Sequence, residues 1–285
     1  LKIYGNYIHD VGAGISGGTA GAQVLSGWFV TNNVINAGST GVELSNIANL
    51  VVDKNQISSA GTALEVKASG NHAVSDVDIT NNEITGTLNV LAHQSASEEK
   101  TLKTVNIKDN TINGQVNIGA LADGKATVEY VTVRNNKVNF TDKGINITAV
   151  ATSGSGHAIV RNITVDGNEL TGSHVGIDVS TDWGNGTASI RNLTITGNKL
   201  NITDPAAAAY AVGLADVEGY SDFQNNKIIL DGTAGGAYDG VVFSGDYTEN
   251  WTISGNELYG NNVGTGISGF RLKNSLWSGS KLSFE

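Results

Sequence analysis

A short pattern that ends in asparagine recurs ten times along the chain, and it limits the possible folds more than any other feature of the sequence. ITVDGNELTG (163–172) and LTITGNKLNI (193–202) are nearly identical copies of it. The repeated positions are Asn6, Asn33, Asn55, Asn82, Asn110, Asn136, Asn168, Asn198, Asn226 and Asn256. The nine intervals between them cover 250 residues, about 28 each, so insertions between copies are small. A repeat of this length is typical of a solenoid, in which each unit packs only against its neighbours.

A second segment, of the form apolar-x-apolar, lies between successive copies, as in GINIT (144–148) and GIDVS (176–180). Its alternation places Ile177 and Val179 on one face of a strand and Asp178 on the other. Each repeat therefore holds two short strands and a brief third one after the Asn. We expect an all-β chain, a parallel β-helix of about ten coils of three short strands, forming one domain over residues 1–285.

The Asn at a fixed place in each repeat has a structural explanation. A turn between two strands of a coil needs a residue that tolerates the left-handed backbone region, which favours Asn or Gly. Stacked coils align the Asn side chains, whose amides can hydrogen-bond along the column, each bond contributing about 1 kcal/mol and fixing the register. We expect this ladder to consist of Asn33, Asn55, Asn82, Asn110, Asn136, Asn168, Asn198, Asn226 and Asn256.

The order of strand, turn such as T-G-N or N-N, strand and then G-I-x-V resembles the repeat of the pectin-lyase-like superfamily, over essentially the whole chain. The resemblance implies a single-stranded right-handed parallel β-helix, with GIDVS-type segments as the first strand of each coil. It also implies that the outward residues of that first strand, with the loops beside it, form a groove for polysaccharides. The superfamily includes lyases, hydrolases, epimerases, phage tailspikes and surface adhesins, so the resemblance alone does not assign an activity.

Charge and composition limit the partners. A net charge of -10 argues against nucleic acid, and no apolar run approaches the length of a membrane span. Cysteine and methionine are absent and Gly occurs 37 times, a composition similar to that of secreted bacterial surface proteins. We therefore expect a secreted or cell-surface protein whose partners are polysaccharides or neighbouring surface-protein subunits. Residue 1 falls inside the first repeat, so we also expect an upstream cap and a longer parent chain.

Acidic residues gather after the first strand of three successive coils. Aligning GIDVSTDW with GVVFSGDY places Asp182 level with Asp246 and Trp183 level with Tyr247, while Asp216 of the coil between them lies one position off this column. Three carboxylates at intervals of about 5 Å repel one another by about 1 kcal/mol per neighbouring pair in water. Such a column favours a bound Ca²⁺ ion, or a pair of acid/base carboxylates flanked by aromatic platforms for sugars. The same residues can also be solvated loop residues whose side chains point apart.

The segment GFRLK (269–273) adds two basic residues to the same outward face. It is similar to G-I-R-I-K of polygalacturonases, in which the Arg and Lys hold the carboxylate of the substrate, but the Gly-His-Gly, Asn-Thr-Asp and Asp-Asp elements of those hydrolases are missing. A pectate-lyase-like site needs an Asp cluster for Ca²⁺ and an Arg base. The candidate catalytic residues are then Asp182, Asp216, Asp246 and Arg271, of which the three Asp are also the metal ligands, and the candidate substrate-binding residues are Trp183, Tyr247, Lys273 and Asp178.

The lengths of the loops favour one function over the other. The longest stretches without strand pattern are only about ten residues, so a groove on the first-strand face would be shallow. We therefore expect a non-catalytic structural or adhesive β-helix that contacts carbohydrate and needs no cofactor. The alternative is a Ca²⁺-assisted polysaccharide lyase, or a related uronan-acting hydrolase or epimerase, with its site on the first-strand face.

Overall fold

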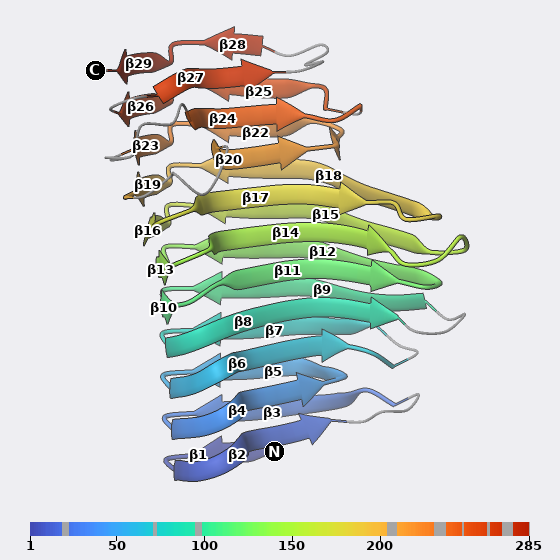
Figure 1. Ribbon diagram of the computed structural model, residues 1–285. Helices are drawn as coiled ribbons and strands as arrows, with labels where there is room; N and C mark the ends of the chain where they lie inside the picture. The colour runs from blue at the N-terminus through green and yellow to red at the C-terminus, as the bar shows by residue number, and fades with distance from the viewer. Residues whose placement is uncertain are drawn as a thin grey trace.

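The computed structural model describes residues 1–18, 23–70, 73–94, 99–203, 210–230, 238–246, 248–260, 263–269 and 276–284. These residues form strands and turns and no helix, and each strand pairs in parallel with the strand one coil away, so the chain is a β-solenoid (Figure 1). In Figure 1 the strands nearest the viewer run to the right and the rear strands run to the left as the chain climbs from its N-terminus, which makes the coil right-handed. Within the described ranges, no segment forms a helix capable of crossing a membrane.

The strands of successive coils stack into three faces. Face A precedes the Asn turn and lies at the rear of Figure 1; it contains β1 (Lys2–Tyr4), β3 (Leu25–Thr31), β5 (Ile47–Asp53), β7 (Val74–Thr80), β9 (Glu99–Lys108), β12 (Lys125–Arg134), β15 (His157–Asp166), β18 (Thr187–Thr196), β21 (Val217–Glu218), β22 (Ser221–Gln224), β25 (Trp251–Ser254) and β28 (Leu276–Ser278). Face B, just after the turn, contains β10 (Thr111–Asn113), β13 (Lys137–Phe140), β16 (Glu169–Gly172), β19 (Lys199–Ile202), β23 (Lys227–Leu230), β26 (Glu257–Gly260) and β29 (Lys281–Phe284).

Face C carries the GIDVS-type strands and lies at the front of Figure 1. It contains β11 (Val116–Ala122), β14 (Lys143–Ala151), β17 (Val175–Asp182), β20 (Tyr210–Ala215), β24 (Tyr238–Ser244) and β27 (Val263–Gly269). In the first four coils one bent strand supplies both face B and face C: β2 (Tyr7–Gly18), β4 (Val34–Ser45), β6 (Gln56–Ala68) and β8 (Glu83–Gln94). The face that the sequence marks as the ligand-binding side is therefore a continuous sheet along the solenoid.

The number of coils differs from the prediction, because the structure has about eight turns rather than ten. Eight steps of the Asn ladder separate Asn33 from Asn256, and these carry the regular coils. The prediction counted every repeated Asn as a full coil. At the ends the regular pattern fades, since Asn6 is exposed and β1 and β28 have only three residues each.

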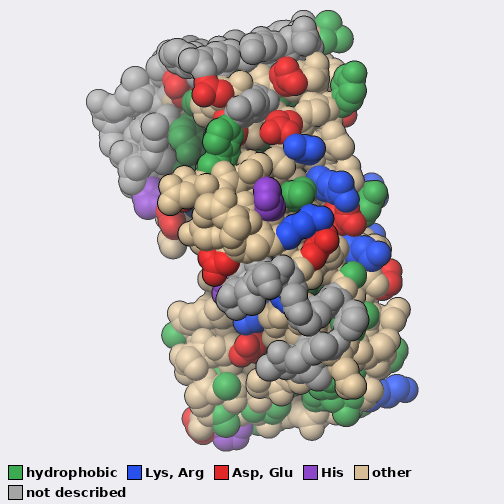
Figure 2. Space-filling model, turned by 90° about the vertical axis from the view of Figure 1, so that its right-hand side faces the viewer, with side chains coloured by type: hydrophobic (Ala, Val, Ile, Leu, Met, Phe, Trp, Pro, Cys, Tyr) green, Lys and Arg blue, Asp and Glu red, His purple; other side chains and the backbone are tan. Residues whose placement is uncertain are grey.

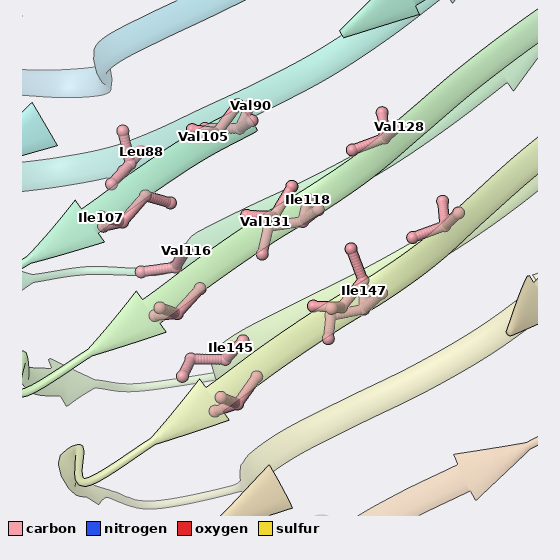
Figure 3. Close-up of a cluster of buried hydrophobic side chains, with 14 of the residues drawn as sticks. Leu88, Val90, Val105, Ile107, Val116, Ile118, Val128, Val131, Ile145 and Ile147 are labelled. Carbon is pink, nitrogen blue, oxygen red and sulfur yellow. The ribbon is translucent and has the colours of Figure 1, made fainter. Parts of the chain in front are cut away.

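The core is a set of columns in which each coil places an apolar side chain above the same position of the previous one. Val116 pairs with Ile145 and Ile118 with Ile147 without any shift in register, and all four are fully buried (Figure 3). Each buried side chain of this size contributes about 1.5 to 3 kcal/mol to folding. The inward residues of all three faces join one cluster among the described residues, so the solenoid is held together without disulfides.

The left-handed residue of each Asn turn is not the ladder Asn but the residue before it. Lys54, Asn81, Asp109 and Asn135 have φ between 52° and 58°, and Gly167 has φ 63°, whereas none of the ladder Asn residues has a positive φ. The sequence-based explanation of the ladder Asn as the left-handed residue is therefore wrong. The left-handed region explains the first letter of the N-N, D-N and G-N pairs, and side-chain hydrogen bonding explains the second.

The ladder itself is confirmed. From Asn33 to Asn226, each side-chain Nδ2 and each backbone N–H donates to the Oδ1 of the next ladder Asn at 2.9–3.0 Å. Each Nδ2 also donates to a backbone carbonyl of the preceding coil, as Asn168 does to Val133. These side chains are no more than 2% exposed. Every buried amide is thus paired on both sides, which makes the column part of the core.

Extending the ladder by one rung is expected to stabilise the protein. Lys281 pairs with Glu257, so Ser280 occupies the ladder position next to Asn256, and its buried hydroxyl has no hydrogen-bond partner. In Ser280→Asn, the new Oδ1 can accept from the backbone and side-chain amides of Asn256, which is expected to add about 1 kcal/mol of stability. Chemical denaturation of the variant beside Ser278→Asn, a control outside the ladder, measures the gain. A variant no more stable than the control would contradict this explanation of the ladder.

Candidate functional site

The C-terminal ends of three neighbouring face C strands surround a depression of about 300 Å³. Its walls come from the residues that follow or end β17, β20 and β24. They are Thr181, Asp182, Trp183, Asp216, Gly245 and Asp246. The structure thus brings together four of the residues that the sequence singles out, namely Asp182, Trp183, Asp216 and Asp246. We call this site the Trp183 depression.

Asp216 is the centre of the hydrogen bonding in the Trp183 depression. Its Oδ2 accepts from the Thr181 hydroxyl at 3.2 Å, and its Oδ1 accepts from the backbone N–H of Asp246 at 2.7 Å. The Thr181 hydroxyl in turn accepts from the indole N–H of Trp183 at 3.0 Å. Three coils are therefore linked by one chain of bonds, which runs from the indole through a hydroxyl to a carboxylate.

Gly245 makes this arrangement possible. Its φ is 90°, and a Cβ at this position would lie 2.0 Å from Oδ1 of Asp216. Asp216 itself has φ 52°, a left-handed conformation that Asp adopts more readily than most residues. The local sequence at both positions is therefore suited to turning the Asp216 carboxylate along the wall of the depression rather than outward.

Asp182 and Trp183 contribute to the depression in different ways. Asp182 accepts a hydrogen bond from the backbone N–H of Gly184 at 3.0 Å, which closes a local turn after β17. Trp183 follows it and is 38% exposed, so part of its ring faces solvent while its N–H is held by Thr181. An indole held in this way can act as a flat apolar platform at the edge of the depression.

The predicted Ca²⁺ site depends on how closely the carboxylates of the Trp183 depression approach one another. In the part of the chain that the structure describes, no three Asp, Glu, His or Cys side chains converge closely enough to hold a metal ion. The reason is visible at Asp216, whose two oxygens are directed at Thr181 and at the backbone of Asp246. The Ca²⁺ site expected at Asp182, Asp216 and Asp246 therefore stays a prediction.

The remaining predicted residues lie elsewhere. Tyr247, Arg271 and Lys273 fall outside the described residues, so their predicted roles stay predictions. Asp178 points outward from β17 as expected, yet it is only 4% exposed and is not available on the surface as a substrate contact. Its burial is the main difference between the predicted and the observed site.

Asp178 is covered by side chains from the coils on both sides. Lys143 of the preceding coil places its ammonium 2.5 Å from Oδ2, and the hydroxyl of Tyr210 donates to Oδ1 at 3.1 Å. Gly213, which pairs with Asp178 in the next strand, leaves room for the ring, because a Cβ there would lie 2.3 Å from Tyr210. We call the side chains of Asp178, Lys143 and Tyr210 the Asp178 clamp.

Lys143 and Tyr210 are not predicted from the sequence, since they lie 35 and 32 residues from Asp178. The signal that could have found them is Gly213. It interrupts an outward column that carries Asn117, Asn146 and Asp178 in the coils before it, and a glycine in such a column leaves space for a neighbouring ring.

The Asp178 clamp makes stability depend on pH in the alkaline range. Burial, followed by the nearby Asp178 carboxylate, raises the pKa of Tyr210 from 10.0 to about 12. A pKa that is higher in the folded state means that the folded protein holds the proton more tightly, so the contribution is present below pH 10 and is lost as the pH rises towards 12.

We expect Tyr210→Phe to be less stable than the parent by about 1 kcal/mol near neutral pH, because one hydrogen bond to a carboxylate is lost. This difference should shrink between pH 10 and 12. Urea unfolding of both proteins across that range measures it, with Tyr4→Phe, at an exposed ring in the first coil, as the control. A difference that stays constant with pH would contradict the role of the Tyr210 proton.

The chain was compared with known proteins on the basis of its sequence. No protein-family model matches it, and no curated protein matches it. Its function therefore has to be inferred from the geometry and chemistry of the Trp183 depression.

Proposed function

We propose that the chain is a non-catalytic structural or adhesive rod, secreted or displayed at a cell surface, that contacts carbohydrate through the Trp183 depression. The observation that carries the proposal is the partly exposed Trp183 ring beside three carboxylates in one shallow site. Aromatic rings provide an apolar surface for a sugar ring, and carboxylates accept hydrogen bonds from its hydroxyl groups. A few polar groups beside an apolar platform are the usual composition of a small-molecule site.

The hydrogen bonds of Asp216 favour binding over catalysis. A general base needs a carboxylate that can approach the proton it removes. Each oxygen of Asp216 already accepts a hydrogen bond from the chain, and Asp182 is engaged by the backbone of Gly184. These contacts hold the carboxylates of Asp216 and Asp182 in place, which suits recognition of a ligand that leaves unchanged.

The charge of the Trp183 depression favours neutral sugars over uronic acids. Its lining includes three Asp and no Lys, Arg or His among the described residues, and the whole chain carries a net charge of -10. An anionic polysaccharide would meet like charges there, whereas the hydroxyl groups of a neutral glycan can donate to the carboxylates. The proposed partner is therefore a neutral polysaccharide.

Membership of the pectin-lyase-like superfamily is part of the proposal. It is supported by the right-handed parallel coil, the three faces and the buried Asn ladder at one corner. Within such a superfamily, rods and adhesins share the scaffold with enzymes, and only the site distinguishes them. Contact with neighbouring surface-protein subunits is compatible with the same rod.

Binding to a panel of immobilised glucan, galactan, mannan, pectate and alginate tests the proposal. We expect retention on at least one neutral polysaccharide, weaker retention on the anionic ones, and about tenfold weaker binding by Trp183→Ala, the loss expected for one aromatic platform. Tyr4→Ala, which removes an exposed ring at the N-terminal end, is the matched control. Absence of binding to every polysaccharide, or equal binding by Trp183→Ala, would overturn the proposal.

A polysaccharide lyase or related uronan-acting enzyme is the second candidate. The observation that favours it is that Asp182, Asp216 and Asp246 line one depression. Neighbouring carboxylates can act as acid and base on a glycosidic bond, and they are also the usual ligands of Ca²⁺. It also requires a base, for which the sequence offers Arg271. An assay for cleavage separates the two candidates.

A further inference from the structure

A bend crosses face A in every regular coil, and it carries one left-handed residue per coil. Most of these residues are of the types that tolerate the conformation: Gly27, Asn49, Asp76, Asn162, Asn192, Gly219 and Asn250. Thr104 and Tyr130 are the exceptions among them, with φ of 54° and 56°. The left-handed region is an outlier for a β-branched or bulky residue, so both side chains strain the backbone, and Tyr130 does so while it carries a large aromatic ring.

The Tyr130 side chain contributes little to the packing of the core. Its side chain is 57% exposed, so the ring lies on the outer surface of face A. Replacement by Asn would relieve the backbone and match the neighbouring coil, where Asn162 receives a hydrogen bond from Asn192. The aromatic ring is thus present at a position where the fold itself would be more stable without it.

A second exposed tyrosine occupies the same bend three coils further along. Arg191 pairs with Glu218 and Thr194 with Asp222, so the later coil has one extra residue at the bend, which holds Gly219 and Tyr220. Tyr220 is 85% exposed. Both exposed rings on this bend therefore occur where the chain departs from its regular pattern.

An outward column of charged residues runs along face A beside the two tyrosines. Consecutive strand pairs place Lys103, Glu129, Arg161, Arg191 and Glu218 above one another. Arg161 lies 2.6 Å from Glu129, and Arg191 lies 2.7 Å from Glu218. Figure 2 looks onto the side of the solenoid that is at the right of Figure 1, so face A lies along its right-hand edge. Towards that edge, acidic and basic side chains of the middle coils are interspersed rather than separated by sign. We call this column together with Tyr130 and Tyr220 the face A strip.

We propose that the face A strip is the contact surface for a second copy of this chain, with the two solenoids antiparallel. Reversing the column about Arg161 places Lys103 opposite Glu218 of the second copy, and Glu129 opposite Arg191 of the second copy. Four contacts between opposite charges result, and the two Arg161 side chains that meet at the axis are each held by their own Glu129. A two-fold contact of this kind uses one self-complementary surface twice.

The composition of the face A strip fits such a contact. Tyr and Arg are the residues that most often carry the binding energy of protein interfaces, and both are held here on a rigid sheet. The strain at Tyr130 is then explained, because the ring serves the contact and not the monomer. The inference is independent of the Trp183 depression, which lies on face C.

Light scattering and sedimentation over a range of protein and salt concentrations test the proposal. We expect a reversible dimer that weakens as salt rises, because its specificity is electrostatic. Tyr130→Asn should raise the thermal midpoint when both proteins are measured at concentrations low enough to be monomeric. At higher concentrations it should weaken the dimer about tenfold, as expected for loss of an interface aromatic. Tyr4→Asn, which removes an exposed tyrosine elsewhere, should not raise the midpoint by a similar amount and should not weaken the dimer.

A mixing experiment examines the register directly. Glu129→Arg and Arg191→Glu each place like charges opposite one another in their own dimers, so each variant alone should be largely monomeric. In an equal mixture, the new Arg of Glu129→Arg faces the new Glu of Arg191→Glu. At the second contact, Arg191 of the first variant faces Glu129 of the second, as in the parent. Both contacts then join opposite charges, so dimers should return. Internal effects of each substitution are the same with and without mixing. A monomeric parent, a mixture with no more dimer than its components, or loss of glycan binding in place of dimer loss in Tyr130→Asn would overturn the proposal.

Discussion

Replacing Asn168 with alanine is expected to lower the free energy of unfolding by about 3 to 5 kcal/mol. Asn168 accepts from both amides of Asn136 and donates to the Asn198 side chain and to the Val133 carbonyl. The substitution leaves several of these buried groups without a partner, and an unpaired buried polar group costs about 1 to 3 kcal/mol.

Equilibrium denaturation of Asn168→Ala measures this loss. Asn139→Ala is the matched control, because Asn139 also hydrogen-bonds an Asn of the neighbouring coil, Asn113, but does so on the exposed side of face B. The control is expected to cost less than about 0.5 kcal/mol, as is usual for surface substitutions. Similar losses in the two variants would mean that the buried column contributes no more than any surface pair.

The second large effect is expected at Asp178. Asp178→Ala removes the carboxylate from the clamp with Lys143 and Tyr210, and breaking a buried ion pair costs about 3 to 5 kcal/mol. Lys143 is about one-third exposed and can turn to solvent, so we expect the lower end of this range, about 3 kcal/mol. Asp178→Asn should lose less, since the amide oxygen can still accept from Tyr210.

Glu169→Ala is the control for Asp178→Ala, because Glu169 pairs with Lys199 at the surface and such pairs contribute less than about 1 kcal/mol. Glycan binding by folded Asp178→Ala is the second readout. Binding should be unchanged, as Asp178 is buried away from the Trp183 depression. A stable variant that no longer binds glycan would instead restore Asp178 as a substrate contact.

The sequence predicts the fold well because one period repeats. The spacing of Asn33 through Asn256 identifies the coils, and the alternation around Ile177 and Val179 identifies the inward residues, both of which the structure confirms. The number of coils is overestimated because regularity at the two ends cannot be judged from repeated letters. The left-handed residue is placed one position too late because the two residues of an Asn-Asn pair have different roles that look alike in a sequence.

The site is predicted less completely. Counting along the strands places Asp182, Asp216 and Asp246 in the same depression, because register is conserved from coil to coil. It cannot tell which way a carboxylate turns, and Asp216 turns towards Thr181 and the backbone of Asp246. The burial of Asp178 depends on Lys143 and Tyr210 at the starts of other strands, and no local pattern relates those residues to it.

The left-handed backbone of Tyr130 could not be predicted from the sequence at all. The sequence shows a tyrosine followed by a regular VTVRNN repeat, and nothing in those letters marks its backbone as left-handed. Only the comparison of stacked coils shows that Asn, Asp or Gly occupies most equivalent positions. Outliers of this kind are visible in a solenoid because every coil provides the reference for its neighbours.

Absorbance at the unsaturated-uronate band tests directly whether the Trp183 depression cleaves polysaccharide as a lyase does. The protein is incubated with pectate, alginate and glycosaminoglycan, with and without Ca²⁺, beside Asp246→Ala. Because we propose that the depression binds glycan without cleaving it, we expect a flat trace for both proteins on every substrate. Absorbance that grows only with Ca²⁺ and is lost in Asp246→Ala would contradict it and make the Trp183 depression the active site of a lyase.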